Sequence, residues 1–159
     1  MKSNKELAGI ITQWINENDY EACSLSIGHG RDETCCAIAD ALAESWQLIQ
    51  TWVRVMGGFL IRQVDWPETA ASWLAQAKEL NQERPDAIAM ISSASSGIAV
   101  LKRLADQRSW SATRTFFLFS DTEDLQIYAP ELAVYEGLKC LTADGKRWIV
   151  ENGGLREIE

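Results

Sequence analysis

The chain has 159 residues but only one histidine, three prolines and four cysteines, and it contains no long apolar run. A membrane-spanning helix needs about 20 consecutive, mainly apolar residues, so we expect no membrane partner. The first residues also lack the apolar block of a secretory signal peptide. These absences favour a cytoplasmic protein.

The cysteines argue against two common kinds of cysteine chemistry. No two of Cys23, Cys35, Cys36 and Cys140 are spaced as C-x-x-C, so we predict neither a zinc ribbon nor a thioredoxin-like redox motif. Free thiols are typical of a reduced, intracellular protein. With a single histidine we also predict no metal site and no cofactor. One alternative stays open, in which Cys35 is a nucleophile in the first turn of a helix and His29 is its base.

Basic residues are too few for a nucleic-acid surface. The formal net charge is −8, and residues 121–159, with nine acidic and four basic side chains, contribute −5 of it. Binding to phosphates needs clustered Lys and Arg, so we predict no nucleic-acid partner. An acidic surface is compatible with solubility alone or with a basic protein partner.

The distribution of apolar residues predicts alternating helices and strands. Helices are predicted from Ser3 or Asn4 to residue 15 and over residues 32–47, 70–82, 98–105 and 132–135; strands over 23–27, 51–56, 87–91 and 115–119. Residues 59–64 either continue the second strand after a glycine bulge or form an edge segment. Residues 65–68 are typical of a helix entry, with Pro67 at an early helical position.

This order predicts one Rossmann-like α/β domain over residues 1–159. Strands that alternate with helices form a mainly parallel sheet with helices on both faces, a three-layer sandwich. Residues 138–142 and 147–150 flank a good turn at residues 143–146, which predicts a C-terminal β-hairpin. Right-handed crossovers bring the strand-end turns to one edge of the sheet, where ligands bind in such folds.

Four turns are predicted to meet at that edge: residues 28–32, Gly57 and Gly58, residues 92–97, and residues 120–124. Glycines permit sharp turns and close approach to a ligand. Helix N-termini offer free N–H groups and partial positive charge, and serine hydroxyls donate or accept hydrogen bonds. The predicted ligand-binding residues are Gly28, His29, Gly30, Arg31, Ser92, Ser93, Ser95, Ser96, Gly97 and Asp121.

Three named motifs are absent from these turns. Gly28 and Gly30 match the start of a dinucleotide-binding fingerprint, but Glu33 replaces its third glycine. No Gly-Lys-Ser/Thr follows either glycine turn, which excludes a P-loop. The G-x-S-x-G elbow of the α/β-hydrolases is also missing, since His29 occupies the centre of the G-x-G turn.

The second half of the chain resembles a known family. Residues 84–90, the serine loop at 92–97, a helix that ends near Trp110, and residues 114–118 are similar to one lobe of the periplasmic-binding-type fold, with the likeness running from residue 84 to about 154. Solute-binding proteins of ABC transporters and related sensor domains use this fold. The resemblance implies that residues 92–97 and Asp121 hold a small polar ligand. It also implies that a second copy, as in a homodimer, or another protein completes the cleft.

Three functional hypotheses follow from the sequence. The first is a cytoplasmic module that binds or senses a small polar or anionic ligand at the strand-end turns. The second is an acidic protein-binding module, such as an inhibitor or immunity protein for a basic partner, with Trp148 and Tyr128 as anchors. The third is a small enzyme in which His29 is a general acid or base, aided by Asp32; of these we favour the first.

Overall fold

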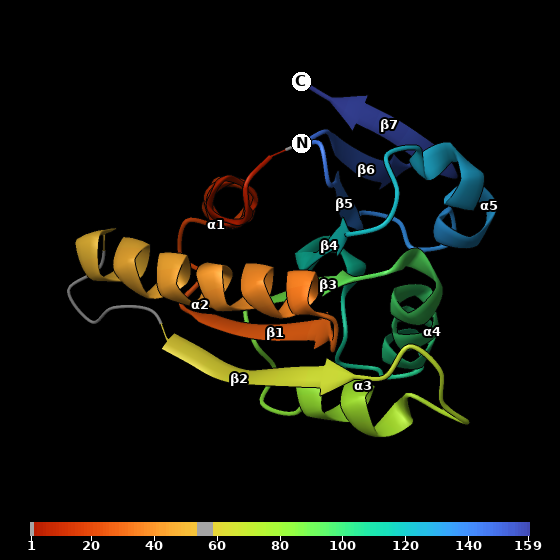
Figure 1. Ribbon diagram of the computed structural model, residues 1–159, viewed down its shortest axis with the longest axis horizontal. Coiled ribbons are helices and arrows are strands. Elements are labelled where there is room, and N and C mark those ends of the chain that lie inside the picture. The colour runs from red at the N-terminus through yellow and green to blue at the C-terminus, as the bar shows by residue number, and fades with distance from the viewer. Residues whose placement is uncertain (1, 54–58) are drawn as a thin grey trace.

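The computed structural model describes residues 2–53 and 59–159. Its helices are α1 (Asn4–Asn18), α2 (Glu33–Val53), α3 (Leu74–Asn81), α4 (Ala94–Ala105) and α5 (Ala129–Leu132), with 3₁₀ turns η1 (Ala112–Arg114) and η2 (Leu125–Tyr128). Its strands are β1 (Ser24–Gly30), β2 (Phe59–Trp66), β3 (Ala87–Ser92), β4 (Thr115–Phe119), β5 (Lys139–Thr142), β6 (Arg147–Glu151) and β7 (Gly154–Ile158). Figure 1 shows their arrangement.

The strands form one seven-stranded sheet in the order β2-β1-β3-β4-β5-β6-β7. The pairings from β2 to β5 are parallel, whereas β5–β6 and β6–β7 are antiparallel. The mainly parallel sheet and the C-terminal hairpin are therefore confirmed. After the hairpin, Asn152 and Gly153, with φ angles of 54° and 75°, turn the chain back, and the following residues form the edge strand β7.

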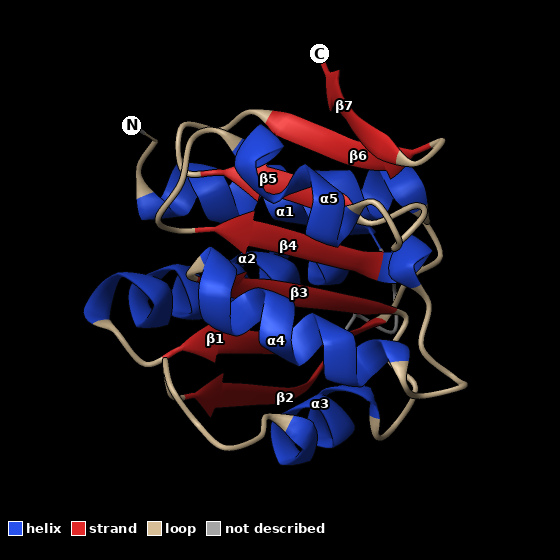
Figure 2. Ribbon diagram, turned by 90° about the vertical axis from the view of Figure 1, so that its right-hand side faces the viewer, coloured by secondary structure: helices blue, strands red, loops and turns tan. Residues whose placement is uncertain are grey.

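Helices cover both faces of the sheet, as predicted. Helices α1 and α2 pack on one face, while α3, α4 and α5 pack on the other (Figures 1 and 2). Every residue of β1, β3 and β4 is consequently buried, which is why these strands are so apolar in sequence. No helix in the described part of the chain has the length and apolar character required to cross a membrane.

Between residues 51 and 82, the structure contradicts the described part of one predicted strand and moves the start of one predicted helix. Residues 51–53 continue α2 and are not a strand; the remainder of the predicted strand 51–56, with Gly57 and Gly58, lies outside the described residues. The second strand of the chain is β2, at one edge of the sheet, which was the alternative for residues 59–64. Residues at the end of a long helix can extend it despite their own preference for strands, because structural context outweighs local propensity.

The third helix begins at Leu74, four residues later than predicted, and Pro67 is not in it. Hydrogen bonds hold residues 67–73 in a loop. The Trp73 indole donates to the Pro67 carbonyl at 3.0 Å, and the Ser72 hydroxyl accepts the N–H of Leu74 at 3.2 Å. The Pro67 carbonyl and the Leu74 N–H thus have side-chain partners in place of the backbone partners that a helix would supply. The loop follows the carboxyl end of β2 and so borders the candidate site.

Candidate functional site

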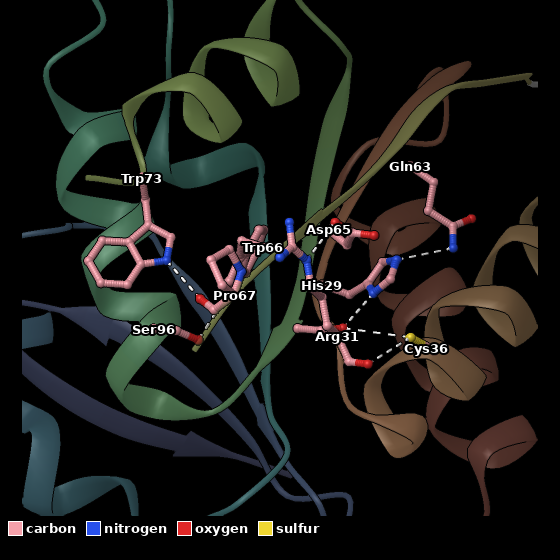
Figure 3. Close-up of polar contacts among 10 residues, drawn as sticks. His29, Arg31, Cys36, Gln63, Asp65, Trp66, Pro67, Trp73 and Ser96 are labelled. Atoms are coloured by element: carbon pink, nitrogen blue, oxygen red, sulfur yellow. Dashed lines mark hydrogen bonds and ion pairs between the residues drawn. The ribbon is translucent and has the colours of Figure 1, made fainter. Parts of the chain in front are cut away.

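The carboxyl ends of β1 to β4 lie at one edge of the sheet, and hydrogen bonds join the segments that follow them (Figures 2 and 3). The Arg31 guanidinium forms an ion pair with Asp65 at 3.0 Å, which connects the ends of β1 and β2. The Ser120 N–H donates to the Ser92 carbonyl at 2.9 Å, which connects β3 and β4. The predicted convergence is therefore present for the segments at residues 28–32, 92–97 and 120–124, whereas Gly57 and Gly58 lie outside the described residues.

Three of the four predicted serines bind other groups of the chain. Ser92 is buried and donates to the Ser93 carbonyl at 2.9 Å. The Ser93 side chain caps α4 by accepting the Ser96 N–H at 3.3 Å, while the Ser96 hydroxyl accepts the Trp66 indole N–H at 3.1 Å. Ser95 differs, since it is exposed and its hydroxyl has no hydrogen-bond partner among the residues that the structure describes. Ser95 is thus the serine of this loop that remains available to a ligand.

Two carboxylates of the chain itself occupy the N-terminus of α4. Asp121 accepts the Ala94 N–H at 3.0 Å. Both oxygens of Glu68 lie near the Ser93 hydroxyl, at 2.6 and 2.8 Å. Negative charge is favoured at a helix N-terminus, so the position that the sequence suggested for an anionic ligand already holds anions. Sequence reasoning missed Glu68 because it placed residues 65–68 at a helix entry rather than after a strand.

His29 lies within β1 rather than in a turn, and the residue is only 6% exposed. Its Nδ1 is 2.7 Å from the Gly30 carbonyl, a contact that assigns the proton to Nδ1. Its Nε2 then accepts from the Gln63 amide at 3.3 Å (Figure 3). The same amide nitrogen donates to Asp40 at 3.0 Å. Both ring nitrogens are thus engaged, and the geometry does not favour His29 as a general acid or base.

Two of the predicted glycines serve the packing of the core. A methyl group on Gly28 would overlap the Trp66 ring, and one on Gly97 would overlap Phe117 and lie 2.5 Å from the Ser92 hydroxyl. The missing side chain of Gly28 leaves room for the Trp66 ring and for Leu80 of α3, and that of Gly97 lets α4 approach the sheet closely. Gly28 and Gly30 are strand residues, which corrects the first part of the turn predicted at residues 28–32.

The structure contradicts the nucleophile hypothesis for Cys35. Burial raises the pKa of its thiol to about 12, and the thiol contacts the Ser120 hydroxyl at 3.4 Å. The nucleophile in cysteine chemistry is the thiolate, which such a pKa makes rare near neutral pH. Asp32 accepts the Cys35 N–H at 3.1 Å at the start of α2, in the manner of a helix cap. Among the described residues, no group of three or more His, Cys, Asp or Glu side chains is placed to hold a metal ion.

A hollow of about 600 Å³ extends from this edge along the outer side of α4. We call it the α4 hollow. Its lining residues are Ala71, Ser72, Trp73, Ser95, Ile98, Ala99, Lys102, Arg103, Asp106, Tyr128 and Glu131. Only Ser95 among these was predicted as a site residue. Trp73 was missed, and Tyr128 was considered only as an anchor for a protein partner, because their approach depends on the loop 67–73 and on η2, neither of which was predicted from the sequence.

No protein family and no curated protein matches the chain. Solved structures with the same fold were found. A putative branched-chain amino acid ABC transporter protein from Rhodospirillum rubrum is 14% identical, with a TM-score of 0.66 over 90% of this chain and 38% of that one. An extracellular ligand-binding receptor from Rhodopseudomonas palustris HaA2 is 16% identical, with a TM-score of 0.58 over 73% and 29%.

A third structure is a solute-binding protein of an ABC transporter from Rhodopseudomonas palustris BisB5, in complex with 3,4-dihydroxybenzoic acid. It is 13% identical, with a TM-score of 0.56 over 82% of this chain and 32% of that one. The chain thus spans about a third of the length of these proteins. The resemblance to one lobe of the periplasmic-binding-type fold is confirmed at the level of fold, and it extends well beyond residues 84–154.

Proposed function

We propose that the chain is a small-ligand-binding module whose ligand lies at the carboxyl edge of the sheet. The observation that carries the proposal is that most of the chain has the fold of a solute-binding lobe and that a hollow opens beside this edge. One such neighbour is described in complex with 3,4-dihydroxybenzoic acid and another as a branched-chain amino acid ABC transporter protein. Fold likeness alone does not transfer a ligand, so the neighbours support only the class of function.

Three exposed polar side chains at the edge are proposed to contact the ligand: Arg31, Ser95 and Asp121, of which Asp121 meets an uncharged polar group of the ligand and not its anion. Arg31 and Asp65 are each more than half exposed in their ion pair, and a solvated pair of this kind gives up its contact at little cost. The Ser95 hydroxyl needs no rearrangement to bind. His29, Ser92, Ser93 and Ser96 support the edge from within, through the hydrogen bonds described above.

This chain forms only one side of the proposed ligand site. Since residues 1–159 span about a third of the structural neighbours, we propose that a second copy of the chain or another protein supplies the opposite wall. A ligand that contacts protein on one side only buries less of its surface than a ligand in an enclosed pocket, which usually buries most of a small molecule. We therefore expect weak binding to the isolated chain and tighter binding to the completed cleft.

A thermal-shift screen against a library of small polar metabolites tests the proposal. A ligand that binds only the folded state raises the midpoint of unfolding. Arg31→Gln should weaken the stabilisation by a bound ligand, while Arg156→Gln should not. Arg156 is a matched control because it is also an exposed, ion-paired arginine, but on the edge strand β7. A screen without any stabilising compound, or equal losses in both variants, would count against the proposal.

A further inference from the structure

The α4 hollow has the size and the aromatic lining of a small-molecule site. Its volume of about 600 Å³ lies within the range of about 300–1,000 Å³ that is usual for such sites. Trp73 comes from the loop 67–73 and Tyr128 from η2, so two separate segments place an aromatic ring at the hollow. Ile98 and Ala99 of α4 add apolar surface between them. This lining suits a flat, apolar ligand body.

Both aromatic rings are held in position by contacts behind them. The Trp73 indole donates to the Pro67 carbonyl at 3.0 Å, as Figure 3 shows. The Tyr128 ring lies 6.2 Å from the ring of Phe119, a fully buried residue of β4. Rings that are already fixed lose little conformational freedom when a ligand binds. The hollow is consequently formed in advance of any ligand.

Several polar groups of the hollow have no partner. Within residues 2–53 and 59–159, the Lys102 ammonium and the Glu131 carboxylate form no ion pair, and the Ser95 and Tyr128 hydroxyls form no hydrogen bond. Ser95, Ala99 and Lys102 are spaced so that they share one face of α4. An ammonium and a hydroxyl on one face are donors for a carboxylate. Arg103 adds a second positive charge, although it forms a 3.7 Å ion pair with Asp106.

The acidic residues set a limit on the charge of the ligand. Asp106 and Glu131 also line the hollow and offset the positive charges of Lys102 and Arg103, so a ligand with more than one negative charge is disfavoured. The N-terminus of α4 is closed to anions by Glu68 and Asp121. We infer that the α4 hollow binds a small organic monoanion with a flat apolar body, whose carboxylate faces Lys102 and Ser95. This inference rests on the proposed function, because it names the ligand class and its place.

The test uses the ¹⁵N-labelled chain with benzoate as the probe, at low ionic strength, where charge contacts are least screened. The readout is the indole N–H resonance of Trp73, which is assigned by its loss in Trp73→Phe. Benzylamine and benzyl alcohol serve as probes with the same ring and a different charge. We expect a saturable shift with benzoate and a much smaller shift with the other two.

The variant Lys102→Gln should weaken benzoate binding by about fivefold, the effect of losing about 1 kcal/mol. Lys78→Gln is the matched control, since Lys78 is an exposed lysine of α3 outside the hollow. Lys102 is exposed, so neither variant is expected to unfold. Equal binding of benzylamine, no shift at Trp73 with millimolar benzoate, or unchanged binding in Lys102→Gln would overturn the inference.

Failure of this inference differs from failure of the proposed function. If a compound from the metabolite screen stabilises the chain but shifts only the backbone amides of Arg31 and Asp121, the function stands and the α4 hollow is not its site. If neither benzoate nor any screened compound binds, both proposals fail.

Discussion

Both carboxylate oxygens of Glu68 lie within hydrogen-bond distance of the Ser93 hydroxyl, at 2.6 and 2.8 Å. Ser93 caps α4, and Glu68 follows the edge strand β2. The contact therefore fastens the loop 67–73 to the first turn of α4 and places a negative charge beside the positive end of that helix. For this reason we place the anion of a ligand in the α4 hollow and not at the helix N-terminus.

Replacing Glu68 by Gln should tighten the binding of an anionic ligand. The change removes one negative charge next to the α4 hollow and keeps a side chain that can accept from Ser93. Since Glu68 is exposed, the gain should be at most about 1 kcal/mol, or about fivefold in Kd. Isothermal titration with benzoate measures it, with Glu79→Gln on α3 as the control. Weaker binding in Glu68→Gln would show that the carboxylate assists the ligand.

Gly97→Ala should destabilise the fold even though alanine is the better helix former. The added methyl group would overlap Phe117 and force α4 away from the sheet, at a cost of about 1–3 kcal/mol. Gly9→Ala is the matched substitution in α1, where nothing lies within 4 Å of the added atom, and it should stabilise by about 0.5–1 kcal/mol. Urea denaturation of both variants measures the two effects. A stable Gly97→Ala protein would contradict the close packing of α4.

Much of the architecture could be predicted from periodicity, because buried parallel strands are apolar and helices carry a regular apolar stripe. Residues 87–91 and 115–119 are clear strands on this basis, and both are found in the sheet. The elements between residues 51 and 82 were predicted less accurately. The edge strand β2 has a partly polar sequence, and the loop 67–73 carries alanine and tryptophan at spacings that imitate a helix.

The place of the candidate site followed from topology, but its chemistry did not. Strand ends meet at one edge in any such sheet, so Arg31, Ser93 and Asp121 were expected near one another. Whether a serine faces a ligand or a neighbouring group depends on tertiary contacts, and Ser93 instead donates to Glu68. A histidine in an apolar strand carries the same ambiguity, and His29 proved to be buried.

Asp86 should make the stability of the protein depend on acid. Burial raises the pKa of this carboxyl, but the N–H groups of Cys23 and Ser24, at 2.8 and 3.0 Å, lower it by more, so it lies below the ordinary 3.8. Because the pKa is lower in the folded state, the stabilisation is complete above the ordinary value and disappears as the pH falls through the folded value.

The variant Asp86→Asn isolates this contribution. Its stability should be lower than that of the wild type at neutral pH by about 1 kcal/mol, after allowance for solvent screening, and the gap should close in acid. Urea denaturation of both proteins along a pH series measures the gap. A gap that stays constant down to the lowest pH would contradict the assignment.

The cysteines should differ in their reaction with iodoacetamide at pH 8. Cys35 and Cys140 are buried, and burial raises the pKa of both thiols, that of Cys35 to about 12. Cys23 and Cys36 are only partly buried, so we expect them to be alkylated first in the native protein. Mass spectrometry of the digested chain identifies the labelled sites. Preferential labelling of Cys35 would revive the nucleophile hypothesis.

The most direct test of ligand binding at the carboxyl edge is chemical-shift mapping of the ¹⁵N-labelled chain with the best compound from the thermal-shift screen. We expect the largest shifts at Arg31, Ser95, Asp121 and the Trp73 indole, with little change at the opposite edge around Ser24 and Asp86. Shifts concentrated at the opposite edge, or no saturable shift with any stabilising compound, would contradict the proposed function.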